Sequence, residues 1–170
     1  VLVEPDAPPL QLRTGEVAAR MHRRFGGFEA AAYGYYGFFK QPLGFDGVTG
    51  KPIFPRLGVY GASTRGTLLG GIFNLEGALY HSVDDWSGRD PMVPNSQVRG
   101  LVGYEHELVA NMTLGVQYYV EIVLRHARLL QSSPTPGFEP DELRQVTTLR
   151  WTYRLLRDDL TLSLFAFFSP

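Results

Sequence analysis

The stretch that most constrains the fold is a long alternation of apolar and polar residues at 113–125, "TLGVQYYVEIVLR". Every second residue from Leu114 to Leu124 is apolar, and most of the residues between them are polar or glycine. Alternation with a period of two places the two sets on opposite faces of a β-strand. The run is about twice as long as the 5–6 residues that are usual for a strand in a soluble protein.

The same alternation recurs along the chain. The predicted strands cover 15–25, 28–39, 55–64, 68–81, 98–108, 113–126, 144–155 and 160–168. Short links stand at 26–27, 65–67, 109–112 and 156–159, and long links rich in Pro, Gly, Asp and Ser stand at 40–54, 82–97 and 129–143. The sequence therefore predicts an all-β, antiparallel up-and-down meander of about eight strands, which forms a single domain over 1–170 with 1–14 as the tail of a loop.

Short turns that alternate with long polar loops are typical of a transmembrane β-barrel, in which the long loops share one side of the membrane. A barrel strand needs about 9–11 residues to cross the bilayer. A helical span is excluded, because the longest stretch without Asp, Glu, Lys or Arg has 13 residues, 108–120, against the roughly 18 required. The meander is therefore interpreted as part or all of a transmembrane barrel.

The alternation also assigns side chains to the two faces of such a barrel. We expect the lipid-facing side chains of the opening stretch to be Leu114, Val116, Tyr118, Val120, Ile122 and Leu124. We expect the lumen-lining side chains to be Arg20, Arg24, Arg56, Glu76, Arg99, Glu105, Gln117, Tyr119, Glu121, Arg125, Arg150 and Arg154. Facing arginine and glutamate rows can filter ions and small solutes, or they can be inward ion pairs that plug a narrow barrel.

Composition narrows the functions that remain. The formal net charge is -1, which gives no reason to expect a nucleic-acid partner. The 16 basic residues include 2 lysines and therefore 14 arginines, and this scarcity of lysine mildly favours a membrane protein, although a GC-rich genome would also produce it. The chain has no cysteine, so a disulfide, a thiolate metal site and a cysteine nucleophile are excluded.

The remaining motifs point to no chemistry. The four histidines are scattered, and the acidic stretch 84–90, "DDWSGRD", lacks EF-hand spacing, so we expect no metal and no cofactor. Ser63, His81 and His126 are too dispersed in the sequence to nominate a hydrolase centre, so we expect no enzymatic activity.

Three strings carry a resemblance to a known class of protein: "FPRLGVYGAS" at 54–63, "LVGYEHELVANMTLGVQYYVE" at 101–121 and "LTLSLFAFFSP" at 160–170. They are similar to strings in uncharacterised proteobacterial β-barrels of the Gram-negative outer membrane, broadly porin-like or exporter-like. The resemblance implies an outer-membrane location, lipid as a partner, and passage of small hydrophilic solutes or export of a polymer. It implies no catalytic residue, transported substrate or oligomeric state.

Two alternatives stay open at this point. A soluble, lipocalin-like barrel that binds an apolar ligand would show the same alternation with its apolar face turned inward, and a structural or plugged outer-membrane barrel would show it without a conducting path. Counting the turns also puts both chain ends on the side of the long loops. Since single-chain bacterial barrels have periplasmic termini, we expect the chain to be a fragment of a larger barrel of ten or more strands.

Overall fold

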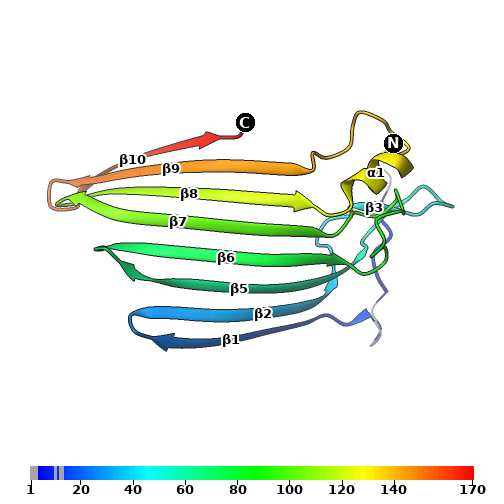
Figure 1. The fold of residues 1–170 in the computed structure, drawn as a ribbon, viewed down its shortest axis with the longest axis horizontal. Coiled ribbons are helices and arrows are strands. Elements are labelled where there is room, and N and C mark those ends of the chain that lie inside the picture. Colours follow the sequence, from blue (N-terminus) through cyan, green and yellow to red (C-terminus); the bar gives the residue numbers. More distant parts are fainter. Residues whose placement is uncertain (1–3, 10, 12–13) are drawn as a thin grey trace.

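The alternating segments form one antiparallel sheet of eight long strands in the computed structural model, which describes residues 4–9, 11 and 14–170 (Figure 1). The strands are β1 (Val17–Phe25), β2 (Phe28–Phe38), β5 (Arg56–Leu68), β6 (Gly71–Ser82), β7 (Gln97–Val109), β8 (Met112–Val123), β9 (Leu143–Leu155) and β10 (Leu160–Phe168). Each pairs with the next along the chain, in the order β1-β2-β5-β6-β7-β8-β9-β10. The prediction of an all-β, antiparallel meander of eight strands is confirmed.

Short turns and long loops lie at opposite ends of this sheet. The turns β1–β2, β5–β6, β7–β8 and β9–β10 gather at the left of Figure 1, and the three long connections gather at the right. The first turn uses Gly26 and Gly27 at φ values of 52° and 82°. Positive φ at both central residues defines the type I′ turn, whose twist suits a two-residue hairpin.

One predicted turn was misplaced. The β5–β6 turn lies at Leu69 and Gly70, with φ values of 49° and 80°, and not at 65–67. β5 therefore has 13 residues, which brings Arg65 into the sheet. The error arose because "RGT" contains a glycine, whereas the actual turn begins with a leucine, a residue that rarely adopts the left-handed conformation.

The long connections contain small elements that the sequence did not reveal. β3 (Gly44–Phe45) pairs with β4 (Pro52–Ile53) inside the first long loop, and α1 (His126–Ser132) begins the third. β8 ends at Val123, earlier than predicted, because Arg125 turns into the left-handed region (φ 57°) and α1 follows. At seven residues, α1 is too short to cross a bilayer, and among the described residues no other α-helix is present.

The buried side chains gather where the long loops meet. The largest of the buried apolar residues are Phe38, Phe39, Leu57, Val93 and Val123. Ser82, the last residue of β6, is fully buried. Backbone hydrogen bonds join the loops to one another, from Phe45 to Met92 (2.8 Å) and from Leu124 to Ser96 (2.8 Å). The three loops therefore form a joint cap with a core of its own.

The N-terminal segment also reaches this cap. The Asp6 amide donates to the carbonyl of Pro52 at 2.8 Å, and Asp6 forms a parallel bridge with Ile53. The predicted loop tail at 1–14 is described in part, since residues 1–3, 10 and 12–13 lie outside the described residues.

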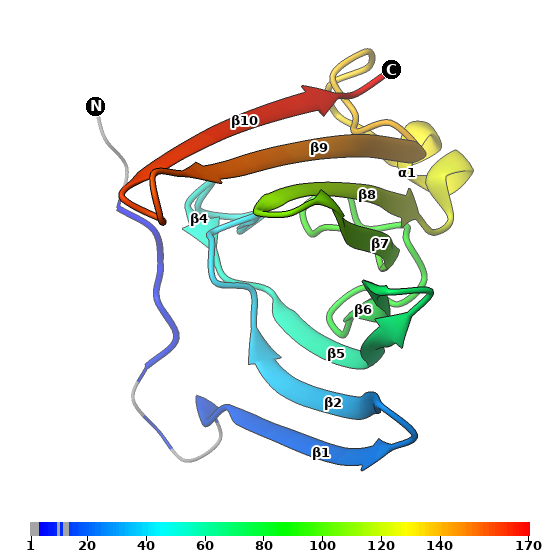
Figure 2. The same cartoon turned by 90° about the vertical axis from the view of Figure 1, so that its left-hand side faces the viewer.

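The sheet is curved and open. Figure 2 looks along the strands and shows a trough with β1 and β10 at its two rims. β1 pairs with β2 and β10 pairs with β9, and neither rim strand has a second partner strand among the described residues. The sheet therefore has a concave and a convex face, and the register decides which side chains occupy each.

Candidate functional site on the polar face of the sheet

Strand register sorts the side chains into two continuous faces, because directly paired residues point to the same side of a sheet. Gln117 of β8 pairs with Gly103 of β7 and Thr148 of β9, and Glu121 pairs with Arg99 and Arg144. We call the side that carries Gln117 and Glu121, with the residues in register with them, the polar face. The opposite side, which carries Val116, Tyr118 and Val120, is the apolar face.

The polar face is the concave one. A hollow of about 450 Å³ is lined, apart from Tyr104, by residues of this face from six consecutive strands, β5 to β10, including Arg65, Asn74, Glu105, Gln117 and Arg150. Side chains of one face from six neighbouring strands can enclose one hollow only if the sheet curves around them. This curvature agrees with the trough in Figure 2.

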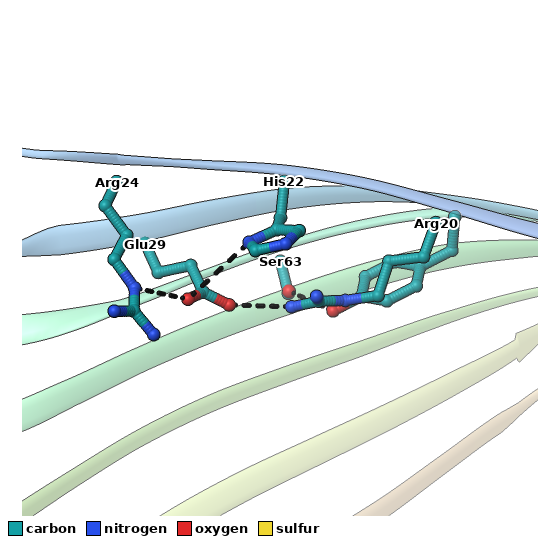
Figure 3. Close-up of polar contacts among 6 residues, drawn as sticks. Arg20, His22, Arg24, Glu29 and Ser63 are labelled. Atoms are coloured by element: carbon teal, nitrogen blue, oxygen red, sulfur yellow. Dashed lines mark hydrogen bonds and ion pairs between the residues drawn. The ribbon is translucent and has the colours of Figure 1, made fainter.

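A basic cluster occupies the polar face at the β1 rim (Figure 3). Glu29 of β2 accepts from Arg20 at 2.6 Å and from Arg24 at 3.0 Å, and its carboxylate lies 3.8 Å from Nδ1 of His22. The three basic residues alternate along β1, so all of them point to the side on which Glu29 lies. One carboxylate thus holds two guanidinium groups in fixed positions.

The Tyr33 hydroxyl continues this cluster into the sheet. It lies 2.9 Å from the hydroxyl of Ser63, and the Arg20 guanidinium lies 5.7 Å from the Tyr33 ring centroid. Ser63 therefore meets a phenol, and among the described residues it makes no hydrogen bond with a histidine. The cluster lacks the nucleophile–base contact of a serine hydrolase, so its chemistry is that of an electrostatic and hydrogen-bonding surface.

A second ion pair lies deeper in the trough. Nε of Arg99 is 3.2 Å from the Glu121 carboxylate, and the Tyr119 hydroxyl donates to Glu121 at 2.7 Å. The Arg99 guanidinium also stacks over the ring of Tyr80, at 4.0 Å from its centroid. The side chains of Arg99 and Glu121 are 32% and 16% exposed, so these charges are partly withdrawn from solvent.

The apolar face is uncovered by any described element. Its side chains Leu75, Val102 and Val116 are 48%, 40% and 43% exposed, more than the charged side chains of Arg99 and Glu121 on the other face. A soluble antiparallel sheet shows the reverse pattern, with its apolar face against a core and its polar face in water. An exposed apolar surface that extends over eight strands is larger than the patches usual on a soluble monomer.

The structure brings most of the expected lumen-lining residues together. Those in register on the polar face are Arg20, Arg24, Glu76, Arg99, Glu105, Gln117, Tyr119, Glu121, Arg150 and Arg154. The expected lipid-facing residues in register on the apolar face are Leu114, Val116, Tyr118, Val120 and Ile122.

Three expected residues lie elsewhere. Arg56 is at the first position of β5, in register with Phe38 on the apolar face, and its guanidinium stacks over that ring at 5.1 Å. Leu124 and Arg125 lie beyond the end of β8, and the Arg125 guanidinium stacks over Trp86 at 4.8 Å. Arg56 lies within β5 but on the face opposite to the expected one. For Leu124 and Arg125, the alternation was extended past the true end of β8, where the loop cap dictates the backbone.

The polar face also contains residues that the sequence did not nominate: Glu29, Tyr33, Arg65 and Arg144. β2 is apolar on both sides, so its alternation gave no direction for Glu29 and Tyr33. Arg65 was assigned to a turn. The Gly-Gly turn at 26–27 could have predicted the face of Glu29, because a two-residue turn between β1 and β2 places Arg24 directly opposite Glu29.

The acidic stretch at 84–90 stabilises its own loop. The Asp85 side chain accepts hydrogen bonds from the amides of Ser87, Gly88 and Asp90 at 3.0, 3.0 and 2.7 Å. Burial alone would raise the pKa of Asp85, but hydrogen bonds from Ser87 and the loop backbone outweigh it and lower that pKa. Among the described residues, no group of three or more His, Asp or Glu is placed to hold a metal ion.

Comparisons with known proteins add no assignment. No protein-family profile matches the sequence, and neither a curated protein nor a solved structure matches it.

Proposed function

We propose that this sheet is a wall of a transmembrane β-barrel in a Gram-negative outer membrane, and that its polar face lines a path for small hydrophilic solutes. One observation carries the proposal: the apolar face is convex and exposed, whereas the concave face holds the charges. Lipid satisfies such a convex face, and water satisfies such a concave one. The resemblance of three strings to outer-membrane barrels supports the same interpretation.

Strand length supports the proposal. The eight strands have 9 to 13 residues, and about 9–11 are needed to cross a bilayer. In the described strands, the charged residues of the apolar face are Arg23 and Arg56, and both lie near strand ends. A long arginine side chain at such a depth can extend its charge to the membrane surface.

The distribution of aromatic residues on the apolar face also supports it. Near the short turns lie Phe25, Phe28, Trp151 and Tyr153. The strand centres carry mainly smaller or aliphatic residues, with Tyr60, Tyr104 and Tyr118 as exceptions. Aromatic side chains that flank an aliphatic band are typical of the interfacial girdles of membrane barrels.

The lipocalin-like alternative gains no support from the geometry. A barrel that binds an apolar ligand inside needs its apolar face on the concave side, and here that side carries ion pairs such as Arg99–Glu121.

Single cysteines test the orientation, because the protein has no other cysteine. Val116→Cys and Gln117→Cys lie on opposite faces of one strand. We expect a fluorophore at position 116 of the protein in phospholipid vesicles to be quenched by brominated lipid, and one at 117 by aqueous iodide. Equal quenching of both labels by iodide would refute the membrane orientation.

Conductance tests the path. We expect the purified full-length protein to give discrete conductance steps in planar bilayers. If the label at position 116 senses lipid and no conductance appears, the barrel is a structural or plugged one, and the transport part of the proposal fails alone.

A further inference from the structure

Four charged side chains in the hollow have no charged partner, unlike their neighbours on the same face. Elsewhere the polar face pairs Arg20 and Arg24 with Glu29, and Arg99 with Glu121. Within the hollow, Arg65, Glu76, Glu105 and Arg150 form no ion pair and no side-chain hydrogen bond with any described residue. The hollow therefore presents two positive and two negative groups that a solute can satisfy.

The geometry around Gly115 separates one of these pairs. Glu105, Gly115, Arg150 and Phe165 are successive partners across β7, β8, β9 and β10. The Glu105 carboxylate leans over the glycine, since a Cβ at position 115 would lie 3.5 Å from Oε2 of Glu105. The Arg150 guanidinium leans the other way and stacks over the Phe165 ring at 5.6 Å.

A gap thus lies between an anion and a cation that belong to one row of the sheet. Glu105 and Arg150 stand two strands apart, about 10 Å along the sheet. Gln117 and Thr148, which are partners in the next row, add an amide and a hydroxyl beside the gap. The volume of the hollow, about 450 Å³, falls in the range of sites for small molecules.

We propose that this hollow binds zwitterionic solutes, specifically free α-amino acids or short peptides, as a step in their passage along the polar face. The carboxylate of the solute binds the Arg150 guanidinium, which suits it in a bidentate geometry. The ammonium group binds the Glu105 carboxylate. This inference rests on the proposed function for transport, but the binding itself is measurable without it.

Charge balance favours a zwitterion over other hydrophilic solutes. An anion would satisfy the two arginines and be repelled by the two glutamates, and a cation would meet the opposite conflict. A neutral sugar would leave all four charges without a partner. A solute with both charges, held a few ångströms apart, satisfies Glu105 and Arg150 together.

Three dipeptide probes of similar size and one larger neutral sugar test the proposal by calorimetry on the full-length protein in detergent. Alanyl-alanine carries both charges, its N-acetyl derivative only the negative one, and its C-terminal amide only the positive one; maltose carries none. We expect alanyl-alanine to bind with a dissociation constant on the order of 1 mM, because a transport site must also release its solute. We expect each singly charged analogue to bind about tenfold more weakly.

Matched variants locate the site. Arg150→Gln should weaken the binding of alanyl-alanine and of its N-acetyl derivative about tenfold and leave the binding of the amide unchanged. Glu105→Gln should weaken the binding of alanyl-alanine and of the amide about tenfold and leave the binding of the N-acetyl derivative unchanged. Arg154→Gln and Glu107→Gln are controls on the same strands and the same face, outside the lining of the hollow. Maltose binding in place of alanyl-alanine, equal binding of all four probes, or equal effects of hollow and control variants would each overturn the proposal.

The two proposals fail separately. If the label at position 116 senses lipid but alanyl-alanine does not bind, the solute class is wrong and the membrane barrel stands. If a variant does not fold, as judged by circular dichroism, the four probes on the unaltered protein still decide.

Discussion

Val116 and Gln117 are neighbours in β8 that project to opposite faces, and arginine at each position measures what those faces contact. Val116 lies four positions after Met112 in a strand of 12 residues. With a rise of about 3.4 Å per residue and a tilt of about 40°, it stands about 10 Å from the turn end, near the middle of an apolar band about 25 Å tall. Arginine at that depth on the lipid side costs about 2–4 kcal/mol.

The structure makes this cost specific to the bilayer. The Val116 side chain is 43% exposed, so Val116→Arg removes little packing and in water would change stability by only about 0.5 kcal/mol. Gln117→Arg places the same charge in the trough, where water and the Glu105 carboxylate of the neighbouring strand are near. We expect this second change to cost less than about 1 kcal/mol.

Reversible denaturant unfolding of the protein in phospholipid vesicles supplies the measurement. A difference of 2–4 kcal/mol corresponds to about a 30-fold to 1,000-fold change in the folding equilibrium. Val120→Arg, on the same face of the same strand, should repeat the result of Val116→Arg. Equal stabilities of the Val116→Arg and Gln117→Arg proteins would refute the lipid contact of the apolar face.

Three further predictions follow from local geometry. Leu69→Asn should stabilise the protein by about 1 kcal/mol in denaturant unfolding, because Leu69 occupies a left-handed position that asparagine tolerates; unchanged or lower stability would contradict this. Because the folded state holds the pKa of Asp85 below its ordinary value of 3.8, the ordering of its loop persists above about pH 4 and is lost only as the pH falls through that depressed pKa. Trp151→Phe leaves Trp86 as the one tryptophan of the sequence, so the fluorescence emission of that variant should report the loss of loop order. A transition centred above about pH 5 would count against a lowered pKa of Asp85. Glu29→Gln should shift the reversal potential of the conducting protein toward anion selectivity, because Arg20 and Arg24 lose their shared counter-charge; a shift toward cations would be inconsistent with the paired cluster.

Alternation could predict the strands and the division into two faces, because both depend on a local period of two. β8 is the clearest case: the residues from Leu114 to Ile122 lie within one strand and alternate between two rows in register with β7 and β9. Alternation could not predict which face is concave, since reversing the curvature of the sheet leaves the pattern unchanged. That choice depends on the curvature of the whole sheet.

The misplaced details share a different physical cause. The β5–β6 turn uses a leucine in the left-handed region, so residue preference pointed to the wrong tripeptide and removed Arg65 from the sheet. α1 and the β3–β4 hairpin form where loops distant in sequence meet, as in the hydrogen bond from Phe45 to Met92. Contacts between loops leave no periodic signal in the chain.

The two rim strands set a strict condition on the membrane proposal. β1 and β10 have 9 residues each and pair on one side only among the described strands. In an antiparallel ladder about half of the backbone groups of a strand point to each side, which leaves roughly four N–H groups and four C=O groups per rim. In lipid each unpaired group costs several kcal/mol, and the sum exceeds the 5–15 kcal/mol that usually stabilise a domain.

Both rims must therefore be paired in a bilayer, whether with each other or with further strands. The amides of β1 and β10 in phospholipid micelles should then exchange with deuterium as slowly as those of β6 and β7, which have partners on both sides. An open sheet would instead show alternation along each rim strand, with every second amide exchanging at the rate of an unprotected peptide. Such alternation in β1 and β10, beside full protection in β6 and β7, would mean that the rims face water and that the sheet does not form the wall of a closed barrel.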